Sequence, residues 1–218
     1  ARFSIAMDGV KSVEPPDVAL KAYDWKKLPP GSLVVDVGGG VGSATDTIVK
    51  SFPDLKFVVQ DRPAVVEDAK KVIHHSNDFF NVQPRKDVTV FMVRQILHDW
   101  PEEYCAKILK HLRSAAGPNT TLLVLDRILP HACQSPEDDE AIPGAIPREA
   151  PAPLIANYGT ANDMVFMIDI IMCLMFNSQE RTIHQFNRLS TSTGWRLTTV
   201  NRQLGDSAYT QAMKPIAV

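Results

Sequence analysis

The chain has 218 residues, of which 44% are hydrophobic, and a formal net charge of −2 at pH 7. A near-neutral chain offers no electrostatic footprint for nucleic acid or an anionic membrane surface, so neither is expected as a partner. The three cysteines, Cys105, Cys133 and Cys173, are odd in number and widely spaced, which argues against a disulfide framework or a structural zinc site. The composition predicts a globular protein in a reducing, cytoplasmic setting.

The N-terminal stretch and the longest apolar run each carry a further expectation. The opening stretch ARFSIAMDGV has neither an initiator methionine nor the pattern of a signal peptide, so we expect a fragment or a processed form. The longest apolar run, MVFMIDIIMCLMF at 164–176, has 13 residues and contains Asp169. It is shorter than a bilayer span requires, and no transmembrane segment is expected.

Short β-branched runs alternate with longer helical patterns, which is typical of βαβ units and a parallel sheet. Pro63 lies in the first turn of one such helix, where the missing N–H costs nothing. The pattern predicts an α/β fold with an open, doubly wound, mostly parallel sheet and helices on both faces. The expected strands occupy 33–38, 56–61, 88–95, 120–129, 195–203 and 209–218, and the later helices occupy 101–116, 161–176 and 182–194.

The alternation fails between 131 and 160. This stretch contains five prolines and the acidic patch PEDDE. Both features indicate a long surface loop. His131 and Cys133, which lie close together there, are interpreted as surface residues rather than a metal pair, and the His74-His75 pair as solvent-facing.

The stretch VVDVGGGVG at 34–42 follows the first predicted strand directly. Ligands of open α/β sheets bind outside the carboxyl ends of strands, so a glycine loop there predicts a ligand site, although a tight turn without a ligand remains an alternative. A dinucleotide fingerprint needs glycine where this chain has Ser43. The acid Asp36, two residues before Gly38, suits a ligand with a cationic amine better than a pyrophosphate. These features favour S-adenosylmethionine, which carries an ammonium and a sulfonium group and no phosphate.

A second acid, Asp61, ends the second predicted strand, 21 residues after Gly40. A carboxylate at this place accepts hydrogen bonds from ribose hydroxyls. Because NAD and S-adenosylmethionine both contain ribose, Asp61 does not distinguish them, and it also fits the N-cap of the following helix.

The stretch RQILHDWPEEY at 94–104 places His98 just after a predicted strand. Asp126 ends the next strand at the same sheet edge, and Glu180 precedes a helix in NSQERTIHQF. A histidine with two carboxylates nearby predicts a general base with the groups that orient it. A purely structural histidine is the alternative.

Together the elements VVDVGGGVGSAT, QDRP, NDFF, LHDWPEEYCAKIL, VLDRILP, DIIM and NSQERT resemble the class I S-adenosylmethionine-dependent O-methyltransferases of the plant caffeate and fungal small-molecule type. The resemblance covers 1–218 and implies one catalytic domain with a Rossmann-like sheet of about seven strands. Members usually carry an N-terminal dimerisation domain, and this chain begins where that domain would end. A homodimer is therefore expected when that domain is present.

The resemblance also implies roles for individual residues. His98 would take the proton from a substrate hydroxyl, with Asp126 and Glu180 as its supports. No metal is needed by this scheme, and the acceptor would be a phenolic or polyketide-like ring of secondary metabolism. The residues implied for S-adenosylmethionine and its product S-adenosylhomocysteine are Asp36, Gly38, Gly39, Gly40, Asp61, Arg62, Asp78, Phe79, Arg94, Asp99 and Trp100, and those for the acceptor are Met7, Met172 and Met175.

The residues Met164, Ile168, Ile171 and Met175 recur at helical spacing, and for the stripe as a whole core packing is the preferred interpretation.

Two positions depart from the family pattern. Asp126 stands where glutamate is expected and Arg94 where lysine is usual. Two other functions remain open. One is a nicotinamide-dependent oxidoreductase on a similar sheet, and the other is a methyltransferase-fold binding protein that has lost catalysis.

Overall fold

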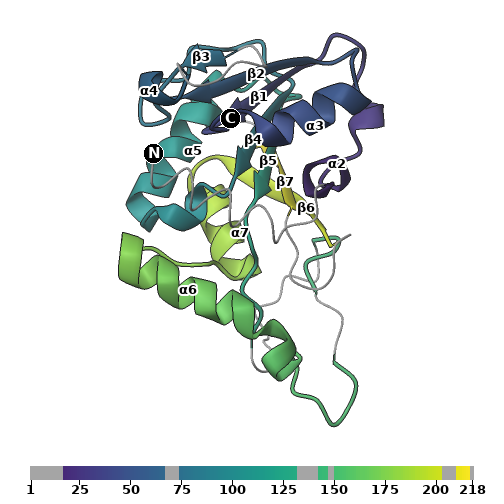
Figure 1. Cartoon of the computed structure of the whole chain (residues 1–218), viewed down its shortest axis with the longest axis vertical. Helices are drawn as coiled ribbons and strands as arrows, with labels where there is room; N and C mark the ends of the chain where they lie inside the picture. The colour runs from purple at the N-terminus through teal and green to yellow at the C-terminus, as the bar shows by residue number, and fades with distance from the viewer. Residues whose placement is uncertain (1–16, 67–73, 132–141, 147–149, 203–209, 217–218) are drawn as a thin grey trace.

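The computed structural model describes residues 17–66, 74–131, 142–146, 150–202 and 210–216. Its centre is a seven-stranded sheet of order β3-β2-β1-β4-β5-β7-β6 (Figure 1). β7 is antiparallel to both of its neighbours, and the other pairs are parallel. The fold class is thus confirmed. The strands are β1 (Leu33–Val37), β2 (Lys56–Asp61), β3 (His74–Ser76), β4 (Val90–Arg94), β5 (Thr121–Leu125), β6 (Trp195–Asn201) and β7 (Thr210–Pro215).

The strand order reverses between β1 and β4. The chain runs outward from β1 through β2 to β3, and then returns to the other side of β1 to add β4 and β5. In a doubly wound sheet such a switch point opens a crevice at the carboxyl ends of the two strands. The glycine loop follows β1 and the His98 segment follows β4, so the topology brings both to this crevice.

Helices cover both faces of the sheet. On one face α5 (Glu102–Ala115) and α7 (Ile183–Ser192) pack against one set of alternating strand side chains, such as Val35 and Val124. On the other face, α2 (Val18–Lys21) and α3 (Ser43–Ser51) pack against the alternate set, such as Val34 and Leu123. Because both faces of the parallel strands are covered, their sequences are nearly continuous apolar runs.

Two local features differ from the sequence prediction or extend it. β3 was not predicted, because His74-His75-Ser76 has no apolar pattern; it pairs in parallel with β2, and His75 is exposed as expected. The helix α4 (Pro63–Val66) begins at Pro63 as predicted, and its predicted continuation lies outside the described residues.

The predicted surface loop at 131–160 is partly buried. Ile142 and Ala145 belong to the main hydrophobic cluster, and the N–H of Val200 donates to the carbonyl of Pro143 at 2.9 Å. The Arg202 side chain donates to the carbonyls of Gly144 and Ala145, both at 2.7 Å. This part of the loop therefore packs against β6, while Cys133 lies outside the described residues.

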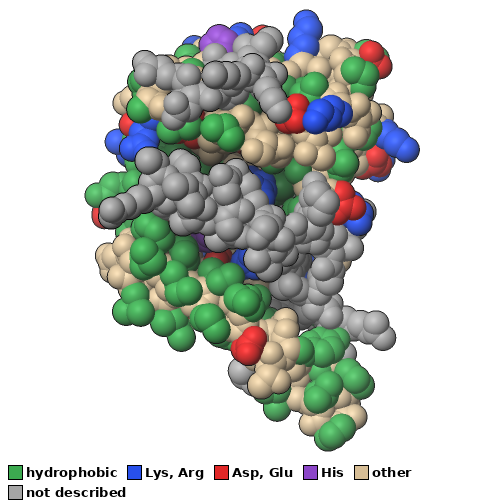
Figure 2. Space-filling view, in the orientation of Figure 1, with side chains coloured by type: hydrophobic (Ala, Val, Ile, Leu, Met, Phe, Trp, Pro, Cys, Tyr) green, Lys and Arg blue, Asp and Glu red, His purple; other side chains and the backbone are tan. Residues whose placement is uncertain are grey.

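The helix α6 (Asp163–Phe176) lies at the end of the molecule remote from β3 and is largely exposed (Figures 1 and 2). Met164, Ile171 and Met175 are 52%, 38% and 69% exposed, so the core-packing interpretation of this stripe was wrong. With the preceding turn η3 (Gly159–Asn162), the helical run reaches 18 residues and is apolar and long enough, by length and composition alone, to cross a membrane. One such helix is weak evidence for a span, and the expected absence of a membrane partner stays a prediction.

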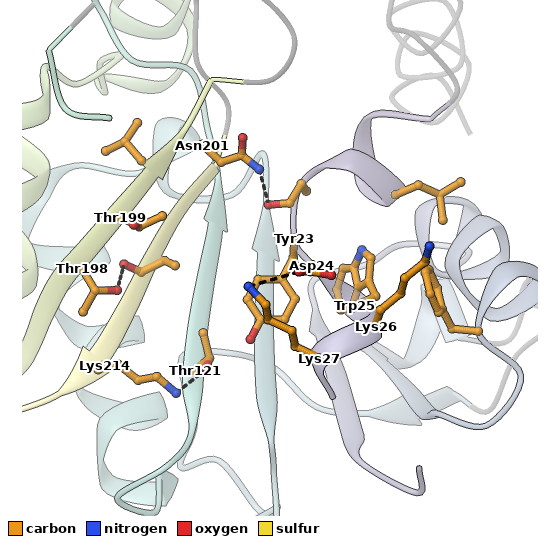
Figure 3. A pocket seen from close by; sticks show the side chains of 15 residues that line it. Tyr23, Asp24, Trp25, Lys26, Lys27, Thr121, Thr198, Thr199, Asn201 and Lys214 are labelled. Atoms are coloured by element: carbon orange, nitrogen blue, oxygen red, sulfur yellow. Dashed lines mark hydrogen bonds and ion pairs between the residues drawn. The ribbon is translucent and has the colours of Figure 1, made fainter. Parts of the chain in front are cut away.

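A cavity of about 680 Å³ lies between the segment around Trp25 and the β5, β6 and β7 strands (Figure 3). None of the predicted site residues lines it. Of its charged side chains, Lys27 forms an ion pair with Asp24 at 3.2 Å, and Lys214 donates to the Thr121 hydroxyl at 2.6 Å. The predicted site residues lie instead at the switch point between β1 and β4.

Candidate active site

Three glycines of the loop after β1 have left-handed backbone conformations. The φ angles of Gly38, Gly40 and Gly42 are 71°, 60° and 78°. Side chains other than glycine rarely adopt this region. The loop is closed by the N–H of Gly38, which donates to the carbonyl of Gln60 at 2.7 Å, and the chain then enters α3 with Gly42 as its N-cap.

Close packing explains the other demand for glycine here. A Cβ on Gly39 would collide with the carboxylate of Asp36, and one on Gly38 would lie 2.7 Å from the Ile96 side chain. A Cβ on Gly40 would meet nothing within 4 Å. Gly39 is thus needed for packing against Asp36, and the contact at Gly38 is with the flexible end of Ile96. Gly40 has open space on that side, as a loop that receives a ligand requires.

Asp36 is inside the loop rather than on its surface. Its side chain accepts a hydrogen bond from the Thr45 hydroxyl at 2.6 Å, and the residue is 2% exposed. The buried carboxylate therefore supports the loop from the protein interior. The predicted attraction for a cationic amine would act across the loop backbone.

Asp61 connects the glycine loop to the end of β2. One carboxylate oxygen accepts from the N–H of Gly40 at 2.9 Å, and the other accepts from the N–H of Arg62 at 2.7 Å. Each oxygen keeps a lone pair, so the position still fits the predicted ribose contact. The Arg62 residue itself is exposed.

Aromatic rings form a cluster beside this loop. Phe79 and Phe80 meet edge to face at 4.9 Å between ring centroids, and Trp100 lies 6.0 Å from Phe79 and 4.7 Å from Phe80. Asp78 shapes the turn by accepting from the N–H of Phe80 at 2.9 Å. Phe79, Asp78 and Trp100, which the resemblance implied for S-adenosylmethionine, are thus gathered on one side of the glycine loop.

His98 lies in a short 3-10 turn, η2 (Leu97–Asp99), just after β4. Gln95, between Arg94 at the strand end and this turn, has a φ of 52°, which is uncommon for a residue other than glycine. Backbone strain of this kind clusters at functional sites. The strained turn brings the imidazole to the sheet edge.

His98 and Glu180 are joined by a hydrogen bond. Nδ1 of His98 lies 2.9 Å from Oε1 of Glu180, whose side chain is fully buried, while 15% of the His98 side chain is exposed. Nε2 lies 3.5 Å from the Asp99 carboxylate, beyond a good hydrogen bond. Because Nδ1 donates to Glu180, neutral His98 carries its proton on Nδ1 and leaves Nε2 as the acceptor.

The electrostatics of this cluster are strongly perturbed. Burial alone would lower the pKa of His98, but the hydrogen bond to Glu180 and the charges of Asp126, Glu180 and Asp99 outweigh it and raise the pKa to about 9. Burial raises the pKa of Asp126 to about 6, with the Glu180 charge contributing. Asp126 is 1% exposed and acts on His98 through its charge, while Glu180 provides the hydrogen bond.

Two residues that sequence reasoning missed hold this cluster in place. The side chain of Arg181 is buried and donates to the carbonyls of Leu97 and Trp100 at 2.7 and 3.0 Å. Asp169 of α6 accepts from the N–H of Glu180 at 2.8 Å. The ERT element pointed to this segment, but backbone acceptors have no sequence signature.

The remaining predicted positions are dispersed. Met172 is 9% exposed on α6, Met175 on the same helix is 69% exposed, and Met7 lies outside the described residues. In the part of the chain that the structure describes, no group of three or more His, Cys, Asp or Glu side chains is arranged to hold a metal ion. Cys105 is buried and Cys173 exposed, both as free thiols.

The fold and the site define a class of protein: a doubly wound α/β domain with a glycine loop after β1 and a hydrogen-bonded His–Glu pair at the same sheet edge. A family model described as the O-methyltransferase domain matches residues 1–146. The chain belongs to this family.

Curated relatives agree with this assignment, and a solved structure agrees with the fold. The chain is 41% identical over 231 aligned positions to 4-O-methyltransferase 1 of Phanerochaete chrysosporium, covering 99% of this chain and 49% of that protein. It is 30% identical to sterigmatocystin 8-O-methyltransferase of Aspergillus parasiticus, covering 91% and 42%. The structure of human N-acetylserotonin methyltransferase in complex with S-adenosylmethionine matches at a TM-score of 0.71 and 23% identity, over 99% of this chain and 55% of that one. The chain spans about half the length of these relatives.

Proposed function

We propose that this domain catalyses transfer of a methyl group from S-adenosylmethionine to a hydroxyl of a small aromatic molecule, with His98 as the general base and without a metal. The observation that carries the proposal is the His98–Glu180 hydrogen bond of 2.9 Å at the sheet edge that also bears the glycine loop. The family match favours this reaction over the nicotinamide-dependent alternative, as does Ser43 in place of the third fingerprint glycine.

The described residues fit the cofactor. The open space beside Gly40 lets a ligand approach the backbone, and Asp61 is half-buried with lone pairs left for ribose hydroxyls. Phe79 and Trp100 offer apolar surface for an adenine. When bound, S-adenosylmethionine supplies an electrophilic methyl group on a sulfonium.

The chain's own residues would then accept the proton of the substrate hydroxyl. A phenol has a pKa near 10, so it is mostly protonated at neutral pH and benefits from a base. Nε2 of neutral His98 accepts the hydroxyl proton, while Glu180 holds Nδ1–H and stabilises the imidazolium that forms. Such assistance contributes about 10²–10⁴ in rate. The loop glycines and the aromatic cluster would contribute the alignment that an in-line displacement needs.

The first test is a calorimetric titration with S-adenosylhomocysteine and, separately, with NAD. Saturable binding of the former and none of the latter supports the cofactor assignment, while binding of NAD alone contradicts it. The second test is His98→Ala with a panel of phenols as acceptors. We expect turnover to be lost while S-adenosylhomocysteine binding persists, and an active His98→Ala protein would refute the assignment of the base. If the wild-type chain binds S-adenosylhomocysteine but methylates no phenol in the panel, the binding-protein alternative gains support.

A further inference from the structure

Arg181 is a buried cation whose partners surround the candidate base. The residue is 1% exposed, and its guanidinium donates from Nη1 to the carbonyl of Leu97 at 2.7 Å and from Nη2 to the carbonyl of Trp100 at 3.0 Å. These two carbonyls lie on either side of His98 in the chain. Its Nε meets the carboxylate of Glu102 at 3.2 Å, where the glutamate side chain is 45% exposed. One planar side chain thus fixes both ends of the turn that carries the imidazole.

The same residue is linked through its backbone to the partner of that imidazole. Glu180 precedes Arg181 directly, and the backbone carbonyl of Arg181 accepts from the N–H of Leu129 at 2.9 Å. A β-bridge joins Arg181 to Ile128 in the segment after β5. The backbone at Glu180 and Arg181 is therefore anchored, and the side chain of Arg181 reaches from this anchor to the His98 turn.

We infer that Arg181 is a positioning residue: it sets the distance between the turn that carries His98 and the backbone that carries Glu180, so that Nδ1 and Oε1 meet. The guanidinium suits this task because its donors form a rigid fork that reaches several acceptors at once. A lysine ammonium keeps the charge but concentrates its donors at one point. The Sγ atom of Cys105 lies 3.1 Å from each of the same two carbonyl oxygens, between which its single S–H is shared.

A substitution of Arg181 can change the pKa of His98 in two opposite ways, through loss of its charge and through displacement of the His98 turn. Removing a nearby cation, taken alone, favours the imidazolium and raises the pKa of His98. Losing the hydrogen bond to Glu180 removes a cause that raises this pKa, and so lowers it. Arg181→Lys keeps the charge and tests position alone, and Arg181→Gln tests both at once.

The experiment is an NMR titration of the His98 ring in the full chain, in parallel with kcat and KM at a pH above 9. We expect Arg181→Lys and Arg181→Gln to lower the pKa of His98 by about one unit or more, the scale on which a strong charged contact acts. We expect kcat to fall on the order of 10²-fold, as for a displaced catalytic group. The KM for S-adenosylmethionine should change far less than kcat.

Arg113→Lys is the matched control. Arg113 of α5 also anchors backbone carbonyls, donating to Gly194 at 2.9 Å and to Ile216 at 2.7 Å, and both of these carbonyls lie outside the candidate site. We expect a lower unfolding temperature in this variant with the pKa of His98 unchanged. A general loss of stability would change the pKa of His98 in the Arg113 and Arg181 variants alike. A positioning role changes this pKa only in the Arg181 variants.

The kinetic readout rests on the proposed function, but the titration does not. A folded Arg181→Lys protein with an unchanged or raised pKa of His98 overturns the inference and leaves the proposed reaction standing. A lowered pKa in a wild-type chain that methylates no acceptor leaves the inference standing and contradicts the reaction. If the Arg181 variants do not fold, Cys105→Ala is measured instead, because it removes both the thiol shared by these carbonyls and the sulfur that accepts from Nη2 of Arg181 at 3.3 Å. A smaller decrease in the pKa of His98 supports the inference, and no decrease overturns it.

Discussion

Glu180 and Asp126 act on His98 in different ways. The Glu180 carboxylate lies 2.9 Å from Nδ1 and forms a hydrogen bond, whereas Asp126 raises the pKa of His98 through its charge. The sequence alone assigned both acids the same supporting role. The structure therefore separates an orienting carboxylate from an electrostatic one, and the two are distinguishable by substitution.

Glu180→Gln should reduce kcat by on the order of 10²–10⁴, because an amide neither stabilises the imidazolium nor enforces the Nδ1–H tautomer. Asp126→Asn should reduce kcat less, since it removes charge while the hydrogen bond to Glu180 remains. Steady-state kinetics of both variants with saturating S-adenosylmethionine measure the difference. An Asp126→Asn protein as impaired as Glu180→Gln would show that this division between the two acids is wrong.

The pH dependence follows from the raised pKa of His98, which is about 9 in the ligand-free protein. A general base acts when neutral, so kcat/KM should rise with pH up to about 9 and then level off. Glu180→Gln removes the hydrogen-bonded charge, which lowers the pKa of His98, so the rise in kcat/KM should occur at lower pH. A profile that is flat between pH 6.5 and 9 in the wild type would contradict His98 as the base with this pKa.

The same shift has a consequence for stability. The folded-state pKa of His98 lies above its ordinary value of 6.5, so the folded protein binds this proton more tightly than the unfolded chain does. The stabilisation is fully present below pH 6.5 and is lost as the pH rises to about 9. Denaturant unfolding of the wild type and of His98→Asn across this range should show a decline in the first that is smaller in the second. Equal declines in the two proteins would place the cause elsewhere.

The sequence predicted those site residues whose roles follow from their position beside a strand, and it missed those whose partners are backbone groups elsewhere in the chain. The loop glycines, Asp61 and His98 were predicted because each follows a strand at a recognisable spacing, and parallel topology gathers strand ends. Arg181 was missed because its acceptors are the backbone carbonyls of Leu97 and Trp100, and any residue type provides a carbonyl.

The error at α6 has a different cause. The segment 164–176 is apolar almost all round, so its residues define no single face that would show which side is buried. The periodicity of Met164, Ile171 and Met175 was compatible with core packing, but only tertiary structure reveals that these side chains are exposed. β3 was missed for the opposite reason, since its short polar sequence has no apolar pattern at all.

Gly39→Ala should weaken cofactor binding, because the added methyl group collides with the Asp36 carboxylate and forces the loop to move. We expect the affinity for S-adenosylhomocysteine to fall by about tenfold or more, the factor that corresponds to 1.4 kcal/mol. Gly31→Ala is the control: it lies before β1, has a φ of 80° and would meet nothing within 4 Å, so it costs backbone strain without touching the loop. Calorimetry on both variants is the measurement. Equal affinity in the two variants would contradict the packing role of Gly39.

The exposed helix α6 offers a test of the fold itself. Leu174 is 80% exposed, whereas Val165 on the same helix is 4% exposed. Leu174→Ser should therefore change the free energy of unfolding by no more than about 0.5 kcal/mol, as surface substitutions do. Val165→Ala should lower it by roughly 1–3 kcal/mol, because it removes buried methyl groups. Denaturant unfolding of both variants measures this contrast. If Leu174→Ser is the more destabilising change, its side chain is buried in solution and the exposed face of α6 is covered.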